Sequence, residues 1–317
     1  MILTVTLNAA LDVTYQVRAL RPGTSHRVSE VTERPGGKGL NVARVLAALE
    51  HDVTVTGFVG GTTGQMLRDR LTAAVDGAAG TVRDALVPVA GTTRRTVAVV
   101  DAARGETTQL NEPGPLISAE EWHAFTTTYE ELLRSSTAVA LCGSLPPGVP
   151  VGAYARLVRT ARAASVPVLL DTSGEPLRRG LAARPDIIKP NAAELAELTG
   201  SHEPMQASRD ARRRGAHAVV ASLGARGMVA VTPEGRWRVV PPAKVRGRPV
   251  RGNATGAGDA AVAGLLSGLV EGLPWPQRLT RAAALATAAV CAPTAGEFDH
   301  GAYQELLGRV EVTEAGG

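Results

Sequence analysis

The chain has 317 residues, of which 44% are hydrophobic and 20% are charged, so it is long enough and apolar enough to bury a large core. Its formal net charge of +4 arises from acidic and basic residues that are interspersed, and 3% of the residues are aromatic. Nucleic-acid binding is therefore not expected, because it needs clustered basic side chains and commonly uses aromatic stacking.

The N-terminal part of the chain alternates segments with strand and helix patterns. Residues 2–7 are mostly apolar and predict a buried strand. Closely spaced glycines predict a turn over 35–39, and the apolar spacing that follows predicts a helix over 40–49. A second strand is predicted over 53–58, and a helix is predicted around 65–75.

Two further pairs of strands differ from the buried ones because each has a polar face. One pair is predicted over 13–17 and 26–33, and the other over 94–101 and 106–111. These segments do not fit a layer that is covered on both sides. We expect these lid strands, from about 13–33 and 94–111, to form a small β-sheet that projects over the site.

From residue 119 onward, strands and helices alternate with short connections. Helices are predicted over 119–134, 152–165, 192–198, 207–214, 258–271, 276–292 and 301–309. Strands are predicted over 137–142, 166–171, 186–189, 217–222, 227–231 and 236–240. This alternation predicts an α/β fold with a mostly parallel central sheet flanked by helices. We expect residues 1–317 to form a single domain, since no linker or internal repeat stands out.

The sequence carries no strong sign of a membrane, a disulfide or a zinc site. No apolar run approaches the ~18 residues that a membrane span needs, and the N-terminus lacks the basic start of a signal peptide. Cys142 and Cys291 lie far apart and form no metal-spaced pair. We therefore expect a cytoplasmic protein.

The most informative segment is the glycine-rich turn at 251–260, which leads into an alanine-rich helix. The first N–H groups of a helix lack partners inside it and, with the helix dipole, favour a bound anion. We expect Gly256, Ala257 and Gly258 to offer amides to a phosphoryl group, and Asp259 to act as the base toward a hydroxyl. An ordinary helix N-cap is the alternative role for Asp259.

Candidates for contacts with a sugar occur near the N-terminus and in the lid. Asp12 would accept hydrogen bonds from two hydroxyls, or else serve as a turn residue. Gly37, Lys38 and Asn41 open a helix at which Lys38 would hold a phosphate, with a plain tight turn as the alternative. Arg94 would clamp a phosphate, unless it is a solvated charge.

Ligands in open α/β sheets bind beyond the carboxyl ends of the strands, and further candidates follow such ends. Ser144 follows one strand and is a candidate for the substrate side. Lys189, Asn191 and Glu194 follow another. Asn191 and Glu194 would support a magnesium–water shell, with Glu194 as the metal residue, or would instead cap the helix.

Ser222, Gly224 and Gly227 follow a later strand and form a nucleotide loop or a hairpin turn. Two common nucleotide signatures are missing: the Gly-Lys pair is followed by Gly39 instead of Ser or Thr, and no Gly-x-Gly-x-x-Gly follows the first strand. P-loop enzymes and dinucleotide dehydrogenases are therefore disfavoured.

Lysine is rare in this chain, which otherwise uses arginine for positive charge. It occurs only at Lys38, Lys189 and Lys244. Two of these three lie inside glycine- or proline-marked motifs, which suggests that each of those two is a point charge with a specific task.

In their joint order these motifs resemble those of the ribokinase-like carbohydrate kinases, in the phosphofructokinase B branch. The resemblance covers nearly the whole chain. Its segments are MILTVTLN at 1–8 with Leu11-Asp12, GGKGLNVAR at 36–44, GFVGG at 57–61, NEPGP at 111–115, GSLPPG at 143–148, DTSG at 171–174, KPNAAEL at 189–195, SLG at 222–224 and GAGD at 256–259.

The resemblance implies a central sheet with flanking helices, a small β lid that often forms a homodimer contact, and the use of ATP and Mg²⁺. It also implies that Asp259 is the base and that the amides of Ala257 and Gly258 are part of the anion hole. The implied substrate contacts are Asp12, Gly37, Asn41 and Arg94, with Lys38 as a phosphate partner, and the residues implied to serve ATP and its metal are Asn191, Glu194, Ser222 and Gly224.

The leading prediction is a kinase that phosphorylates a primary hydroxyl of a ketohexose phosphate, converting fructose 1-phosphate to fructose 1,6-bisphosphate. The segment at 111–115 resembles the 1-phosphofructokinase version, whereas Val13-Thr14-Tyr15 resembles that of tagatose-6-phosphate kinase. An unphosphorylated hexose is a third alternative. The rival from another class is a non-catalytic, sugar-sensing binding protein, which would have no need of Asp259.

Three departures from the family pattern bear on the substrate. Ala9 stands where proline is common, Ala260 where serine commonly follows the aspartate, and Ser25 where phosphofructokinase 2 relatives carry a lysine ahead of the lid arginine. These changes leave the chemistry intact and leave the identity of the sugar open.

Overall fold

The computed structural model describes residues 1–252, 254–292 and 294–315. Its main feature is a large, mostly parallel sheet, which confirms the predicted α/β class. The central strands are β1 (Ile2–Thr6), β4 (Val53–Val59), β5 (Val82–Asp84), β9 (Ala138–Cys142), β10 (Val168–Asp171), β11 (Ile187–Ile188), β12 (Ala218–Ser222), β13 (Met228–Val231), β14 (Arg236–Val240) and β17 (Glu311–Glu314), with β6 (Val87–Pro88) paired to β4.

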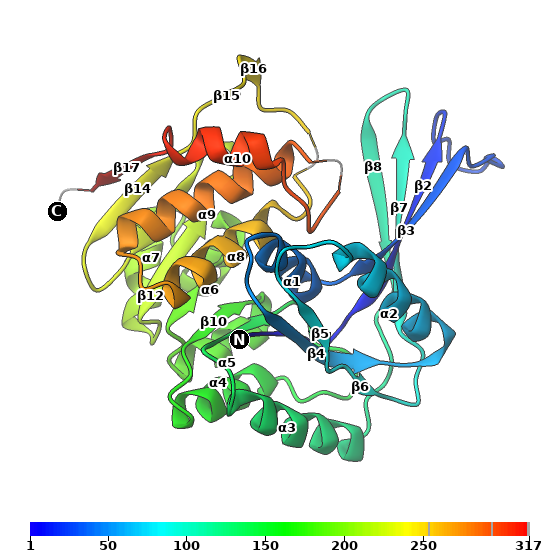
Figure 1. The fold of residues 1–317 in the computed structure, drawn as a ribbon, viewed down its shortest axis with the longest axis horizontal. Coiled ribbons are helices and arrows are strands. Elements are labelled where there is room, and N and C mark those ends of the chain that lie inside the picture. Colours follow the sequence, from blue (N-terminus) through cyan, green and yellow to red (C-terminus); the bar gives the residue numbers. More distant parts are fainter. Residues whose placement is uncertain (253, 293, 316–317) are drawn as a thin grey trace.

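The strand order explains how the functional segments come together. The central sheet runs β17-β14-β13-β12-β11-β10-β9-β1-β4-β5, and the section from β12 to β5 is parallel throughout (Figure 1). Among the described strands of the central sheet, antiparallel pairing is confined to one edge, where it involves β13, β14 and β17. All strands of the parallel section therefore end at the same edge of the sheet, where ligands bind in folds of this kind.

Helices cover both faces of the central sheet (Figure 1). One layer contains α1 (Lys38–Ala48), α2 (Gly61–Val75), α8 (Ala257–Val270), α9 (Trp275–Val290) and α10 (His300–Leu307). The other contains α3 (Ala119–Leu133), α4 (Ala153–Ala163), α5 (Gly174–Ala182), α6 (Ala192–Thr199) and α7 (Pro204–Arg213).

Strand β1 shows why the sheet needs both layers. Every residue of the strand is buried, and successive side chains point to opposite faces. Ile2 packs into the core under α1 and α8, whereas Leu3 and Val5 pack into the core under α3 and α4. A strand that is buried on both faces belongs in the interior of a covered parallel sheet.

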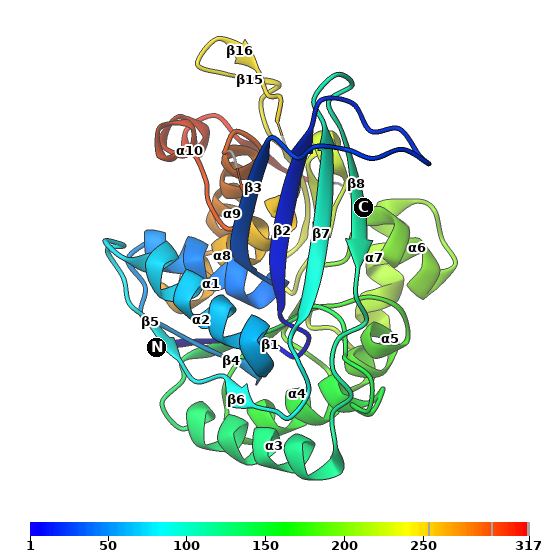
Figure 2. The ribbon, with the colours of Figure 1, turned by 90° about the vertical axis from the view of Figure 1, so that its right-hand side faces the viewer.

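A second, smaller sheet stands beside the carboxyl edge of the central one. It contains β3 (Glu30–Gly36), β2 (Ala10–Val17), β7 (Arg94–Asp101) and β8 (Glu106–Asn111) in that order (Figure 2). The strands at 94–101 and 106–111 coincide with the prediction.

The other two strands of the small sheet differ from the prediction in their bounds. β2 begins at Ala10, so Asp12 lies inside a strand and not in a turn, and β3 begins at Glu30 instead of 26. The register pairs Ala10 with Gly36, which extends β3 through a segment that was predicted as a turn.

The prediction missed helix α5 and five short strands. Helix α5 begins with Gly174, Glu175 and Pro176, a start that reads as a turn without tertiary context. The missed strands are β5, β6 and β17, together with the small hairpin of β15 (Lys244–Val245) and β16 (Arg248–Pro249). Segments of two to four residues show little periodic pattern, and the equally short β11 was predicted only as part of a longer segment at 186–189.

Within the described part of the chain, no helix combines the length and the apolar character that crossing a bilayer requires.

Helices α8 and α9 pack unusually closely, because small residues face each other between them. A Cβ atom on Gly264 would lie 2.7 Å from the Cα of Ala282. We expect Gly264→Ala to lower the free energy of unfolding by about 1–3 kcal/mol, since overpacking two backbones outweighs the gain in helix propensity. Denaturant unfolding measures this change. Gly308→Ala is the matched control, because nothing lies within 4 Å of a Cβ there, and an equal effect of both substitutions would contradict the packing argument.

Candidate active site

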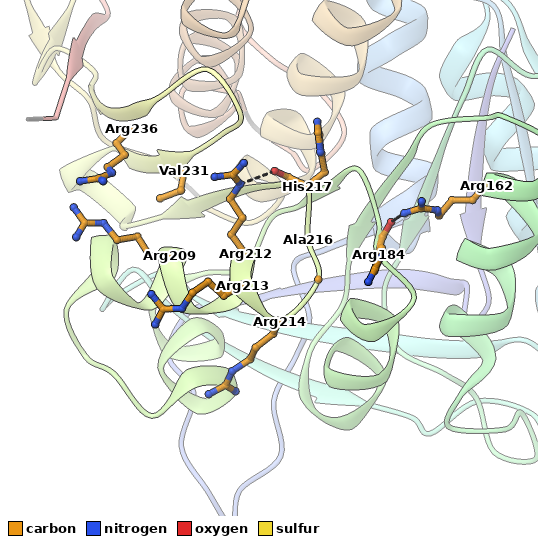
Figure 3. Close-up of a pocket in the computed structure, with 11 residues that line it drawn as sticks. Arg162, Arg184, Arg209, Arg212, Arg213, Arg214, Ala216, His217, Val231 and Arg236 are labelled. Atoms are coloured by element: carbon orange, nitrogen blue, oxygen red, sulfur yellow. Dashed lines mark hydrogen bonds between the residues drawn. The ribbon is translucent and has the colours of Figure 1, made fainter. Parts of the chain in front are cut away.

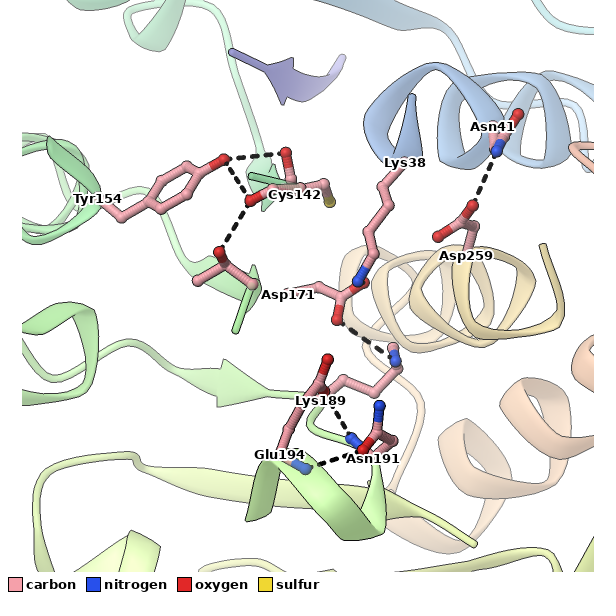
Figure 4. Close-up of polar contacts among 11 residues, drawn as sticks. Lys38, Asn41, Cys142, Tyr154, Asp171, Lys189, Asn191, Glu194 and Asp259 are labelled. Carbon is pink, nitrogen blue, oxygen red and sulfur yellow. Dashed lines mark hydrogen bonds and ion pairs between the residues drawn. The ribbon is translucent and has the colours of Figure 1, made fainter. Parts of the chain in front are cut away.

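The carboxyl edge of the parallel strands gathers charged side chains from distant parts of the sequence. Asp171 ends β10, and Lys189 follows β11 directly. Lys38 reaches the same place from the first residue of α1, and Asp259 reaches it from α8 (Figure 4). Asn191 forms a bridge with Ser222 at the end of β12, which brings two of the predicted nucleotide residues side by side.

Asp171 lies at the centre of this cluster and binds two lysines. Its side chain is 1% exposed, with Oδ2 at 3.3 Å from Nζ of Lys38 and Oδ1 at 3.4 Å from Nζ of Lys189. Burial acts to lower the pKa of Lys38, but the carboxylates of Asp171 and Asp259 outweigh it and raise that pKa above its ordinary value. Two of the three lysines in the chain therefore lie beside one buried aspartate.

Asp259 is 7% exposed and is oriented by an amide from the neighbouring helix. Nδ2 of Asn41 donates to Oδ2 of Asp259 at 2.8 Å. Burial, and then the charge of Asp171, raise the pKa of Asp259 from 3.8 to about 6, while Asn41 and the two lysines act in the opposite direction. The carboxylate is thus a stronger proton acceptor than an ordinary aspartate and is still ionised near neutral pH.

The turn before α8 sets the conformation of the first backbone amides of that helix. Gly256 adopts φ 86°, a left-handed conformation that favours glycine, and it is the N-cap of the helix. The N–H of Ala257, which we had expected to bind an anion, donates instead to the carbonyl of Ala254 at 3.2 Å, because the left-handed turn folds it back. Among the described residues, no hydrogen bond engages the amides of Gly258 and Asp259. Asn253 of this motif lies outside the described residues.

Asp12 lies at the base of the small sheet and is packed against a glycine. A Cβ atom on Gly36 would lie 2.2 Å from Cγ of Asp12, so only glycine allows this approach of carboxylate and backbone. Burial raises the pKa of Asp12 to about 6, against the opposing effects of Arg94, Thr96 and Arg44. Gly37, which follows Gly36 in the sequence, is the N-cap of α1.

Arg94 begins β7 and is held by carbonyl groups. Its Nε donates to the carbonyl of Asn8 at 3.2 Å and its NH1 donates to that of Glu112 at 3.2 Å. Nδ2 of Asn8 in turn donates to Oγ of Ser144 at 3.2 Å. The structure therefore connects three predicted substrate residues, Asp12, Arg94 and Ser144, through the connection between β1 and β2.

Four of the predicted nucleotide residues lie in caps and turns. Oδ1 of Asn191 accepts from the backbone of Glu194, and Oε2 of Glu194 accepts from the backbone of Asn191, so both cap α6 as in the alternative reading. Gly224 and Gly227 lie in the connection of the β12–β13 hairpin, which was also anticipated as an alternative. These contacts leave Oε1 of Glu194 without a hydrogen bond to any described residue.

Three residues of the site were absent from the candidates drawn from the sequence: Asp171, Arg44 and Glu297. Asp171 ends a parallel strand, so the rule that located Lys189 also points to it. NH1 of Arg34 and NH2 of Arg44 both bind Oε1 of Glu297, at 2.7 and 3.0 Å, and thereby fasten the segment after α9 to α1. No local pattern reveals such a pairing, because its partners are more than 250 positions apart.

A parallel α/β sheet with a carboxylate and backbone amides at a helix start defines a class of phosphoryl-transfer site. Residues 5–300 match the model of the pfkB family of carbohydrate kinases, and the chain belongs to that family. It is therefore an ATP-dependent carbohydrate kinase, which transfers a phosphoryl group to an alcohol.

Solved structures of similar proteins agree with this assignment. Phosphofructokinase-2 from Escherichia coli in complex with fructose-6-phosphate is 28% identical, with a TM-score of 0.85 over 97% of this chain and 98% of that one. A possible 1-phosphofructokinase from Thermotoga maritima is 26% identical, with a TM-score of 0.84 over 100% of both chains. The ribokinase of Arabidopsis thaliana, at 24% identity, shares the fold, with a TM-score of 0.73 over 96% of this chain and 98% of that one.

The raised pKa of Asp259 predicts that this carboxylate lowers the free energy of unfolding at neutral pH. The folded-state pKa of about 6 lies above the ordinary 3.8, so ionising this carboxyl costs folding free energy. That cost is absent below the unfolded pKa, grows between about pH 4 and 6, and is complete above about pH 6. We expect Asp259→Asn to raise the free energy of unfolding by about 1–3 kcal/mol at neutral pH, and the gain to disappear near pH 4.

Denaturant unfolding of both proteins at the two pH values measures this difference. The exposed Asp76→Asn is the matched control and should change stability little at either pH. If Asp259→Asn lowered the free energy of unfolding at neutral pH, the claim that ionised Asp259 destabilises the fold would be contradicted.

Proposed function

We propose that this kinase phosphorylates the primary hydroxyl of a ketohexose monophosphate, with fructose 1-phosphate as the leading substrate and fructose 1,6-bisphosphate as the product. The observation that carries the proposal is the position of Asp259, which is buried with a pKa raised to about 6, at the start of α8 and beside Lys38 and Asp171. Similarity to phosphofructokinases supports the substrate class.

The proposed reaction uses Asp259 as the base. The sugar hydroxyl donates its proton to the carboxylate, its oxygen forms a bond to the γ-phosphorus, and the bond between that phosphorus and the ADP oxygen breaks. Asn41 fixes the orientation of the carboxylate through its bond to Oδ2. Positioning and charge stabilisation dominate phosphoryl transfer, so a moderately basic carboxylate is sufficient.

Charge that develops on the phosphoryl group is proposed to be stabilised from two directions. The amides of Gly258 and Asp259 carry the positive end of the α8 dipole. Lys38 and Lys189 supply two positive charges whose positions are set by Asp171. A Cβ on Gly258 would lie 3.4 Å from Nζ of Lys189, so this amine is close to the start of α8.

ATP is proposed to bind beyond the ends of β11 and β12. The proposed contacts are Lys189, Asn191, Glu194, Ser222, Gly224 and Gly227, and the bridge between Asn191 and Ser222 supports their grouping. Magnesium prefers a few carboxylates and several waters, and Glu194 fits it because Oε1 is not used in the cap. When bound, the ion would neutralise charge on the phosphates of ATP.

Asp12 and Arg94 are proposed to bind the sugar, with Arg94 as the phosphate clamp and Gly37 and Ser144 nearby. Their proximity in the small sheet supports this arrangement, since Arg94 pairs in register with Ala10, two residues from Asp12. The sheet is also proposed to act as a lid and to mediate a homodimer. Val31 and Leu110, on its two edge strands, are 56% and 59% exposed and would be covered in such a dimer.

Tagatose 6-phosphate, on the strength of the strand segment at 13–15, is one alternative substrate, and an unphosphorylated hexose is another. A panel of free and phosphorylated ketohexoses, monitored by ATP consumption, tests the proposal. We expect turnover to be fastest with fructose 1-phosphate, and Asp259→Asn to reduce kcat by about 10²–10⁴-fold. Asp76→Asn, the control, should retain full turnover. Binding of sugar without turnover by the unaltered chain would favour the non-catalytic alternative, and unchanged turnover in Asp259→Asn would exclude this base.

The phosphate clamp is tested by comparing two adjacent arginines. Arg94→Ala should raise KM for a phosphorylated sugar by about 10–100-fold, because it removes a charge-assisted contact, and should affect an unphosphorylated sugar far less. Arg95→Ala is the matched control, since the Arg95 side chain is 58% exposed and pairs with Glu112. Equal effects of Arg94→Ala on both kinds of sugar would show that Arg94 acts only through the carbonyls of Asn8 and Glu112.

A further inference from the structure

A hollow of about 690 Å³ on the surface is lined by an unusual concentration of arginines. We call it the arginine hollow. Its seven arginines come from the end of α4 (Arg162), the segment before β11 (Arg184), α7 with its C-cap (Arg209 and 212–214) and the start of β14 (Arg236) (Figure 3). The other lining residues include one histidine and no carboxylate.

The arginine hollow lies at the opposite edge of the sheet from the candidate active site. Arg184 precedes β11 and His217 precedes β12, so both lie at the amino ends of these parallel strands. Lys189 and Ser222, in contrast, lie at the carboxyl ends of the same two strands. The hollow is therefore a separate feature and does not belong to the catalytic machinery.

Most of the positive charge in the arginine hollow has no counter-charge. Of the seven arginines, only Arg213 forms an ion pair with a carboxylate among the described residues, that of Asp210. Arg162, Arg212 and Arg214 donate to backbone carbonyls, which satisfies hydrogen bonds but neutralises no charge. The arrangement leaves a strong positive potential in a concave surface, which focuses the field on an anion.

Arg209 and Arg236 are the two arginines best placed to bind a ligand. They come from α7 and β14, and in Figure 3 both side chains extend to the same side of the hollow. Nε of Arg209 is buried and has no hydrogen-bond partner among the described residues. Neither guanidinium forms an ion pair within the described part of the chain, so a bound anion would supply what both lack.

The lining also narrows the class of ligand. Guanidinium groups match phosphate oxygens through paired N–H donors, and several of them around one volume match an anion with several phosphoryl groups. Ala216 and Val231 are the apolar side chains of the lining, and it contains no Phe, Tyr or Trp side chain, so a platform for stacked bases is not supported. A volume of about 690 Å³ is in the range for a small molecule.

We propose that the arginine hollow is a binding site for a small, soluble anion that carries two or more phosphoryl groups. The ligand bridges α7 and β14, with Arg209 and Arg236 as its main contacts. By neutralising the like charges of the hollow, it also stabilises the fold. This inference is independent of the sugar that the kinase phosphorylates.

Titration calorimetry with tripolyphosphate, at fixed moderate ionic strength, tests the proposal on three full-length proteins. These are the unaltered chain, the Arg209→Gln/Arg236→Gln double variant, and the control Arg83→Gln/Arg134→Gln, which removes two exposed arginines that do not line the hollow. Tripolyphosphate resembles part of ATP and can therefore also bind at the ATP site. Binding at the arginine hollow is the part that Arg209→Gln/Arg236→Gln loses and the control keeps. We expect that loss to be at least about tenfold in affinity.

Thermal unfolding and kinase turnover without added anion accompany the titration. The Arg209→Gln/Arg236→Gln protein should unfold at no lower temperature than the control and should keep its turnover, because the change removes only mutual repulsion. Added tripolyphosphate should raise the unfolding temperature more in the control than in this variant.

Three results would overturn the proposal. Equal tripolyphosphate affinity in all three proteins would show that the hollow binds nothing. Orthophosphate binding as tightly as tripolyphosphate would remove the requirement for several phosphoryl groups. Binding of an oligonucleotide, lost in Arg209→Gln/Arg236→Gln, without saturable binding of tripolyphosphate would assign the surface to nucleic acid instead.

Discussion

The ion pairs of Asp171 are the interaction on which the candidate active site depends. A carboxylate that is 1% exposed needs positive partners, because the cost of an unpaired buried charge is several kcal/mol. Asp171 meets that need with one lysine from α1 and one from the segment after β11. The same contact therefore fixes the start of α1 against the segment that follows β11, and the charge of Asp171 contributes to the raised pKa of Asp259.

The sheet topology explains why such a cluster forms from remote segments. Parallel strands end at one edge, so residues that follow β1, β9, β10, β11 and β12 meet there, although they are spread over more than half of the chain. This regularity made much of the architecture predictable. The helices at 119–134 and 258–271, and the strands at 94–111, follow directly from periodicity, and the family resemblance of motifs such as 256–259 pointed to a kinase.

Other features could not be read from the chain because they depend on tertiary pairing. The fold-back of the Ala257 amide arises from one left-handed glycine and a carbonyl three residues earlier, which a motif does not reveal. Glu297 joins Arg34 and Arg44 across most of the sequence. The arginine hollow is likewise invisible in one dimension: its residues are interspersed with others from 162 to 236, and the even charge pattern that argued against a basic surface conceals it.

The small sheet has a mechanical property that follows from how it is attached. β2 leaves the end of β1, and β7 runs parallel to it from the start at Arg94, so the two strands emerge from the body side by side and in the same direction. Asp12 and Arg94 both lie at this root, whereas the turns of the sheet lie at its far tip. If the small sheet tilts about this root, its tip moves by a large distance and its root by a small one. A tilt of the small sheet about its root would therefore change the relative positions of Asp12 and Arg94 much less than those of the turns.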